Sequence, residues 1–497
     1  MRQCRSTLAL LGLGLTVSGP VPAADFGELM QKQLETGTAR LFGFTKPVTA
    51  SATMPSGFAR SPDQPASAQI ALAQGLQVRY LTRTAAQNTD QMAFWPTDNA
   101  PTHLITCVEE FERQVIGQFP NGTEKYNPSV QRIRLADGKV ETVLRGMAGC
   151  DGIRRTPWGS IVATEEASDG QVYEILNPLQ LTDLTLTGRG AANLFDSSGA
   201  NVTDTENKVA LRGALPKMAW EGLAITSQGV VVAGDELRPG SYTDARTNTK
   251  DTDGGALFKF VPSTPANGAS IANLNQSPLM AGNVYAMQVS CVDNKQQFGQ
   301  GCEVGKAAWV AVTAANARVD ANNAGATGYY RPEDLHDDPA YTGTGLRFCW
   351  TNTENAAAEN YGEVMCGIDR APLSAGSERT VTVNRFVEGD ADFNQPDNLA
   401  FQPGTRNAYV IEDNPNGDVW ACLPDGVDRD IKTDGCVKLL SVVDASAEPT
   451  GFLFSGDGRT AYVSIQHSAD PANGTMDVDG YGTDDVLMIT GFKPVRP

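Results

Sequence analysis

Short apolar runs separated by turn residues fill most of this chain. Runs at 129–135, 256–261 and 408–412 are typical, and Gly, Pro, Asn and Asp punctuate the segments between such runs. Runs of this length favour β-strands, and the turn residues favour tight connections between them. A periodic helical pattern stands out only at 26–35. The pattern therefore predicts an all-β fold with a short helical N-terminal segment.

Five phrases repeat one arrangement, in which a carboxylate, usually beside Pro or Gly, precedes or ends a short apolar run. They are TPWGSIVATEE (156–166), WEGLAI (220–225), RPEDL (331–335), QPDNLAF (395–401) and EPTGFLF (448–454). Repetition over this length favours a β-propeller, whose four-stranded blades take roughly 40–50 residues each. The uneven spacing predicts six blades, one of which has lost its phrase. We expect the phrase carboxylates to converge in a central channel.

The N-terminus predicts export. Arg2 and Arg5 precede an apolar segment at 8–17, and small residues offer a cleavage site near Ala23. This is the pattern of a secretory signal peptide. No later stretch reaches the ~20 apolar residues needed to span a bilayer. We expect a signal peptide at 1–23, an N-terminal segment at 24–70, and a single propeller domain with insertions at 71–497, secreted to the periplasm or the exterior.

Export predicts that the cysteines form disulfides, because an oxidising compartment favours them. Of the nine cysteines, Cys4 lies in the expected signal peptide. Three pairs are close in sequence and are expected to bond locally: Cys291 with Cys302, Cys349 with Cys366, and Cys422 with Cys436. Cys107 and Cys150 remain. They either bond to each other or leave one sulfur as a metal ligand.

The charge and the residue types narrow the chemistry. A formal net charge of −19 makes nucleic acid and anionic membranes poor partners. It suits bound cations, although a soluble secreted surface explains it equally well. Only three histidines occur. The candidate ligands are therefore carboxylates, which favour calcium, magnesium or manganese, with ferric iron as an alternative: Glu165, Glu166, Glu221, Asp235, Glu236, Glu333, Asp334, Asp397 and Glu448.

Each of these carboxylates, taken alone, could simply cap backbone N–H groups in a turn. Several of them converging would repel one another, and cations would relieve that repulsion. Arg331 stands two residues before Glu333 and adds an anion-binding fork. Metals beside a guanidinium suit a phosphoryl oxygen. The alternative for Arg331 is an ion pair with a neighbouring acid.

The phrases also resemble, in order, segments of the PhoX-type secreted alkaline phosphatases. The resemblance spans about 145–467 and rests on TPWGSIVATEE, WEGLAI with VVVAGDE, GALFKFV, RPED, PDNLAF and EPTGFLFSGDGRTAYVSIQH. It implies a six-bladed propeller phosphatase that hydrolyses phosphate monoesters with iron and calcium in the channel. It also implies that Glu221 and Glu333 are metal ligands, that Arg331 contacts phosphate, and that 164–166 correspond to the T-C-E-E segment of the family.

The chain departs from the family pattern around Cys150. The family cysteine binds iron, but here it lies one residue further from TPWG and Asp151 follows it. Trp220 replaces the usual His, and Thr164 replaces the Cys of T-C-E-E. Arg155, in the altered loop, could add a phosphate contact or be solvated.

The sequence thus predicts a metal-dependent phosphatase, acting on small phosphorylated substrates, as a monomer without membrane insertion. The expected cofactors are calcium and, less directly, iron, with Glu165, Glu166, Glu221, Glu333 and Cys150 as ligands. Arg331 is the expected catalytic residue, and Arg331 and Arg155 the substrate contacts. Two alternatives remain open: a calcium-dependent lactonase or esterase propeller, and a non-catalytic binding propeller stabilised by calcium.

Overall fold

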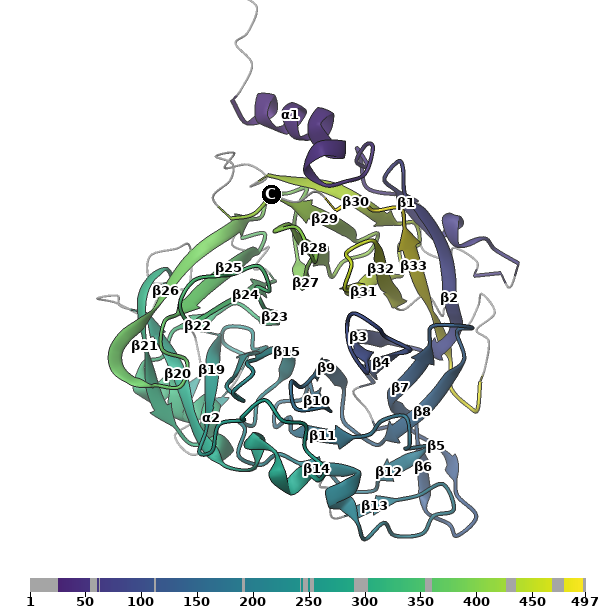
Figure 1. The fold of residues 1–497 in the computed structure, drawn as a ribbon, viewed down its shortest axis with the longest axis vertical. Coiled ribbons are helices and arrows are strands. Elements are labelled where there is room, and N and C mark those ends of the chain that lie inside the picture. The colour runs from purple at the N-terminus through teal and green to yellow at the C-terminus, as the bar shows by residue number, and fades with distance from the viewer. Residues whose placement is uncertain are drawn as a thin grey trace, which may run out of the picture.

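The computed structural model describes a set of β-sheets arranged radially around one central axis (Figure 1). The described residues are 26–53, 60, 61, 63–110, 113–189, 193–241, 243, 244, 249, 250, 254–289, 303–353, 360–425, 435–466 and 478–494. The predicted signal peptide and the predicted Cys291–Cys302 pair lie outside these residues. Within them the fold is nearly all β, so the predicted propeller class is confirmed.

The strands pair into sheets that radiate from the axis. The first half of the chain forms a six-stranded sheet, β3 (Thr89–Trp95), β4 (His103–Val108), β7 (Pro128–Arg134), β8 (Val140–Arg145), β12 (Leu184–Leu186) and β13 (Leu194–Phe195), and a four-stranded sheet, β9 (Cys150–Arg155), β10 (Ser160–Glu165), β11 (Val172–Leu176) and β14 (Val209–Leu211). The last strands form a five-stranded sheet, β27 (Pro396–Phe401), β28 (Ala408–Glu412), β29 (Asp418–Cys422), β30 (Cys436–Val442) and β1 (Ile70–Leu72), and a four-stranded sheet, β31 (Glu448–Phe454), β32 (Thr460–Gln466), β33 (Thr483–Thr490) and β2 (Gln77–Ala86).

The middle of the chain forms one ten-stranded sheet that reaches the axis at both of its ends. Its strands are β15 (Trp220–Ile225), β16 (Val231–Asp235), β19 (Gly255–Pro262), β20 (Gly282–Val289), β21 (Gly305–Val312), β26 (Gly376–Glu388), β25 (Glu363–Asp369), β24 (Leu346–Asn352) and β23 (Pro332–Asp337), with β22 (Gly328–Tyr329) on β19. The prediction of six separate blades is therefore wrong in its count of sheets. The physical reason is that β21 and β26 pair at the periphery and join neighbouring units into one sheet.

Six inner strands nevertheless close a ring around the axis. In order they are β3, β9, β15, β23, β27 and β31; each contacts the next, and β31 contacts β3 (Figure 1). An inner strand is joined to its neighbour in the sheet by a tight turn that often needs glycine. Gly159, Gly229 and Gly458 have φ values of 87°, 89° and 68°, which few other residues adopt.

Two strands that precede the inner strand β3 in the chain complete the last two sheets. β1 pairs with β30, and β2 pairs with β33, so strands from the start of the chain close the ring at its end. The helix α1 (Phe26–Leu41) includes the predicted helical segment and lies against β30 at the periphery (Figure 1). Elements outside the main sheets include the hairpin β5 (Val115–Gln118) with β6 (Glu124–Tyr126), the pair β17 (Thr243–Asp244) with β18 (Thr249–Lys250), and α2 (Ala317–Ala324) beside β19 to β21.

Apolar packing between neighbouring sheets forms the core. All five residues of β28 and all seven of β30 are buried, because both faces of these strands are covered by other sheets. In the part of the chain that the structure describes, three disulfides join buried cysteines: Cys107–Cys150, Cys349–Cys366 and Cys422–Cys436. The two local pairs were predicted. Of the two alternatives for Cys150, the structure contains the disulfide, so this sulfur is not a free thiolate for a metal.

Among the described residues, no helix has the length and hydropathy needed to cross a bilayer.

Candidate metal centre

Five of the six inner strands place a carboxylate at one structural position. In each of these five strands a β-bulge interrupts the pairing with the neighbouring strand. Two consecutive residues of the inner strand lie opposite a single residue of that neighbour. The first residue of each bulge forms a set that we call the axial carboxylates: Asp90, Asp151, Glu221, Glu333 and Asp397. In β31 the corresponding residue is Thr450, next to a bulge of its own.

Three axial carboxylates lie together. One oxygen each of Glu221, Glu333 and Asp397 can be chosen so that all three lie within 4.8 Å of one another. Glu221 and Glu333 are each 2% exposed. Burial, followed by the charges of Asp397 and Glu333, raises the pKa of Glu221 well above its usual range. Burial also raises the pKa of Glu333 to about 8, although Arg331 opposes the shift. A cation between these groups would reverse both effects.

The other two axial carboxylates extend the acidic group. Asp90 and Asp151 are each 4% exposed, and burial followed by neighbouring carboxylates raises the pKa of both. Thr450 Oγ1 lies 2.6 Å from Asp90 Oδ1. Asp151 Oδ1 is buried with no hydrogen-bond partner among the described residues. One oxygen of Asp151 therefore receives no donor from the described residues.

A second set of carboxylates, the flanking carboxylates, follows the ends of the strands next to the inner ones. They are Glu109 after β4, Glu166 after β10, Glu236 after β16 and Asp413 after β28. Burial raises the pKa of Glu109 to about 7, and burial followed by Glu236 and Glu109 raises that of Glu166. Glu448, at the start of β31, contacts Asp413 and also has a raised pKa, mainly from burial. The mutual repulsion shows that both sets face the same region.

Arg331 connects the two sets. Its Nη2 lies 2.7 Å from Glu236 and 2.8 Å from Glu333, and its Nη1 lies 3.9 Å from Asp413. Burial opposes its charge, but the carboxylates of Glu333 and Glu236 outweigh burial and raise the pKa of Arg331. Its backbone φ of 49° is uncommon outside glycine, and Gln395, which precedes β27 as Arg331 precedes β23, shares this value. Arg331 is thus a permanently charged guanidinium inside an acidic cluster.

The structure does not bring all the predicted ligands together. Glu221 and Glu333 lie in the axial set and Glu166 in the flanking set. Glu165 faces another way: it accepts hydrogen bonds from the backbone N–H groups of Ala148 and Gln171 and an ion pair from Arg189 at 2.6 Å. Two further candidates are similarly occupied, Asp235 by Arg318 and Asp334 by Arg154.

Arg155 is the predicted substrate contact that lies apart from this group. It ends β9, whose start carries Asp151, so about four residues or ~13 Å of strand separate them. Its Nη2 pairs with Asp98 at 2.5 Å. Sequence reasoning did not single out Asp90, Asp151 or Glu109 as ligands. The sequence did contain a signal for Asp151. In both Cys-Asp-Gly at 150–152 and Trp-Glu-Gly at 220–222 an acidic residue directly precedes a glycine.

The residues present fit a hard divalent cation. All donors of the axial and flanking sets are carboxylate oxygens, as calcium prefers. Glu221 Oε2 and Asp151 Oδ1 are buried and lack hydrogen-bond partners within the described residues, as expected of atoms that bind a cation. Among the described cysteines none offers iron a free thiolate, because all six are in disulfides, including Cys150 with Cys107. A ferric ion would have only oxygen donors here.

Comparisons with known proteins agree with this architecture. Residues 240–469 match the family model of alkaline phosphatase PhoX, a range that includes Arg331, Glu333 and Asp397. No curated protein matches the chain. Among solved structures, PhoX of Pseudomonas fluorescens in complex with vanadate, a transition state analogue, is 14% identical with a TM-score of 0.58, covering 90% of this chain and 100% of that one.

Two other solved structures match with lower TM-scores. A gluconolactonase of Xanthomonas campestris is 11% identical with a TM-score of 0.40, covering 89% of this chain and 99% of its own. A calcium-binding regucalcin of Agrobacterium tumefaciens is 12% identical with a TM-score of 0.40, covering 85% and 98%. The resemblance to the PhoX alkaline phosphatases predicted from the five phrases is therefore confirmed, with residues 240–469 matching the family model.

Proposed function

We propose that this protein is a secreted, metal-dependent phosphatase that hydrolyses phosphate monoesters at the axial carboxylates. One observation carries the proposal: Glu221, Glu333 and Asp397 form a ligand set whose member Glu333 also holds Arg331 at 2.8 Å. A cation site beside a fixed guanidinium suits a phosphoryl group, because both compensate its negative charge. The family match over 240–469 supports a phosphatase.

The metal would be held first by Glu221, Glu333 and Asp397, with Asp151 and Glu166 as further ligands. Calcium is the cofactor that the oxygen donors favour, and ferric iron is the second choice. When bound, such a cation polarises a phosphoryl oxygen and offsets the charge that develops on it.

Arg331 would bind the substrate phosphate and stabilise the transition state. Its Nη2 is held by Glu236 and Glu333, which fixes the plane of the guanidinium. Its Nη1 is only loosely engaged, 3.9 Å from Asp413, and is the part that could turn toward a phosphate oxygen. A planar fork that is already oriented loses little entropy when it binds an anion.

Secretion is part of the proposal and rests on two features. The predicted signal peptide at 1–23 directs export, and the three disulfides of the described residues suit an oxidising compartment.

The test uses purified protein, its bound metals measured, with p-nitrophenyl phosphate as substrate. We expect hydrolysis that chelation abolishes and calcium restores. Arg331→Ala should lower kcat/KM by about 10²–10³-fold, the usual cost of losing a donor to developing charge. Arg331→Lys should recover part of this, because it keeps the charge but loses the fork.

Arg212→Ala is the matched control, since it also removes a buried arginine from an ion pair, Arg212–Glu174 at 2.6 Å, outside the axial and flanking sets. It should lower thermal stability without a comparable loss of kcat/KM in the folded fraction. Hydrolysis that is insensitive to chelation, or to Arg331→Ala, contradicts the proposal. Turnover of a simple lactone without any turnover of the phosphate ester contradicts it too.

A further inference from the structure

The two carboxylate oxygens of Glu221 have different surroundings. Oε1 accepts hydrogen bonds from two side-chain amides, Asn398 Nδ2 at 3.2 Å and Gln91 Nε2 at 3.4 Å. Oε2 is buried and has no hydrogen-bond partner among the described residues. Glu221, Gln91 and Asn398 are each 2% exposed, so water does not equalise the two oxygens.

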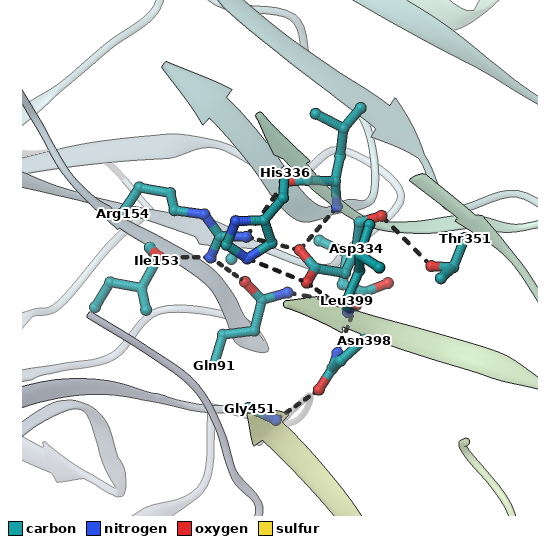
Figure 2. Close-up of polar contacts among 12 residues, drawn as sticks. Gln91, Ile153, Arg154, Asp334, His336, Thr351, Asn398, Leu399 and Gly451 are labelled. Atoms are coloured by element: carbon teal, nitrogen blue, oxygen red, sulfur yellow. Dashed lines mark hydrogen bonds and ion pairs between the residues drawn. The ribbon is translucent and has the colours of Figure 1, made fainter. Parts of the chain in front are cut away.

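Both amides are fixed in one orientation by donors at their other ends. Gln91 Oε1 accepts a hydrogen bond from Arg154 Nη1 at 2.7 Å, and Asn398 Oδ1 accepts one from the backbone N–H of Gly451 at 2.5 Å (Figure 2). Neither a guanidinium nor a backbone N–H can accept a hydrogen bond. A flipped amide would place its NH₂ group against a donor, so each NH₂ group must face Glu221.

The orientation of Gln91 depends in turn on an ion pair. Arg154 Nη2 lies 2.7 Å from Asp334 Oδ1, and the other oxygen of Asp334 accepts the backbone N–H of Leu399 at 3.0 Å (Figure 2). Asp334 follows the ligand Glu333, and Leu399 follows Asn398. His336 Nε2 is 3.6 Å from Asp334 but stays neutral at pH 7, because burial lowers its pKa to about 4. Both oxygens of Asp334 are therefore engaged by donors of the protein, Arg154 and the backbone N–H groups of Leu335 and Leu399.

We propose that Gln91 and Asn398 are positioning residues that occupy Oε1 of Glu221 and thereby present Oε2 alone to the metal. The proposal rests on the proposed function only in assuming that Glu221 binds a cation. A glutamate free to rotate would offer either oxygen or both, and would lose rotamer entropy when it binds. A pre-oriented glutamate binds more tightly, and outer hydrogen-bond partners of metal ligands typically contribute about 10–100-fold in affinity.

The two bulge positions without such side chains are glycines, which fits this arrangement. The second bulge residue is Gln91, Asp334 or Asn398 in three inner strands and Gly152 or Gly222 in two others. A Cβ at Gly152 would lie 1.7 Å from the carbonyl oxygen of Glu221, and one at Gly222 would lie 1.8 Å from Asp334 Oδ1. Glycine at these two positions therefore lets the backbone of Glu221 lie close to β9 and the side chain of Asp334 lie close to β15.

The experiment measures binding of calcium alone to chelated and desalted protein by titration calorimetry. Gln91→Met keeps the volume of the side chain and removes its N–H groups. Gln131→Met is the matched control, because Gln131 is also fully buried and bonded at both ends, to the Ala86 N–H at 2.8 Å and to Tyr481 at 3.1 Å, but on β7. We expect calcium to bind about 10–100-fold more weakly to Gln91→Met than to wild type, and equally well to Gln131→Met.

Asn398→Leu provides a second, independent arm, with Asn407→Leu as its control for loss of a buried asparagine. Thermal unfolding of the chelated proteins shows whether each variant is folded, and Gln91→Met decides the matter if Asn398→Leu unfolds. Unchanged calcium affinity in Gln91→Met, an equal loss in Gln131→Met, or a wild-type protein that binds no calcium overturns the proposal. Weakened binding together with an inactive wild-type enzyme would leave the positioning role standing and refute the phosphatase.

Discussion

The axial carboxylates and a third set, the capped carboxylates, recur around this propeller and differ in what their oxygens contact. The axial carboxylates begin the bulges of the inner strands. The capped carboxylates are the last residues of the adjacent strands, one residue before flanking positions, and comprise Glu165, Asp235 and Glu412. Both sets lie at equivalent places in successive units, so repetition in the sequence does not distinguish them.

Hydrogen-bond donors distinguish the capped set from Glu221 and Asp151 of the axial set. Glu412 accepts the backbone N–H groups of Asn394 and Asp418 and the indole N–H of Trp420, at 2.9 to 3.0 Å. Asp235 accepts the Ala219 N–H and both arms of Arg318. By contrast, Glu221 Oε2 and Asp151 Oδ1 have no donor among the described residues. Buried charges that are satisfied hold a fold together, whereas unsatisfied ones call for a ligand.

The largest expected effect is on activity, from a change in the axial set. Glu221→Gln keeps the shape of the side chain and removes the charge that would bind the cation. We expect kcat/KM for p-nitrophenyl phosphate to fall by about 10³-fold or more, since the loss combines weaker metal binding with weaker charge compensation. Stability of the chelated variant should equal or exceed that of wild type, because one repelling buried charge is gone. A variant with near wild-type kcat/KM would break the distinction between the sets.

The next effect is on stability, from a change in the capped set. Asp235→Ala removes the carboxylate that pairs with the buried Arg318, and breaking such a pair costs about 3–5 kcal/mol. We expect that loss in the free energy of unfolding, measured by denaturant titration in the presence of chelator. Calcium affinity of the folded variant should stay at the wild-type value. A selective loss of calcium binding would instead place Asp235 among the ligands.

A smaller effect concerns pH. In the metal-free protein the pKa of Glu333 is raised to about 8 and that of Glu109 to about 7, mainly by burial. The ordinary value for an unfolded chain is about 4.3. Between about pH 4.3 and 8 the folded state therefore binds more protons than the unfolded state, so stability should fall as pH rises through this window.

Thermal unfolding of the chelated protein between pH 5 and 8 checks this, with calcium added in a parallel series. Calcium favours the ionised carboxylates, so the stabilisation it provides should grow with pH. Glu333→Gln should flatten the fall seen in the chelated protein. If the stability of the chelated wild type rose steadily from pH 5 to 8, the assignment of uncompensated charge to the axial and flanking carboxylates would be contradicted.

The sequence predicted the propeller class because short apolar runs and turn residues act locally. The counting of units failed where β21 and β26 pair at the periphery, since that contact joins strands more than 60 residues apart and leaves no local signal. The site was predicted only in part, because its residues too are brought together by strand pairing that leaves no local signal. Glu221 and Glu333 stand on inner strands and carry the recurring pattern, whereas Glu165 ends a strand one place further out.

The misplacement of Glu165 has a precise origin. TPWGSIVATEE resembles the other phrases in composition but forms the turn after an inner strand and the strand that follows it. The inner strand of that unit is β9, whose carboxylate Asp151 had been noted only as a departure from the family pattern. Which strand faces the axis is decided by the order of pairing within the sheet, which the composition of one phrase does not encode.

The smallest expected effect is at Thr450. Among the six inner strands, β31 is the one whose residue at the axial position, Thr450, is not a carboxylate. Thr450 Oγ1 lies 2.6 Å from Asp90 Oδ1 and 2.6 Å from Asn398 Oδ1. Thr450→Val keeps the shape and removes these contacts, so we expect a loss of about 1 kcal/mol in the free energy of unfolding. Calcium affinity should change less than in Gln91→Met, because the Gly451 N–H still orients Asn398. If Thr450→Val instead abolished calcium binding, the hydroxyl itself would be a ligand. The set would then have six members, and the contrast between satisfied and unsatisfied oxygens would not be sufficient to define it.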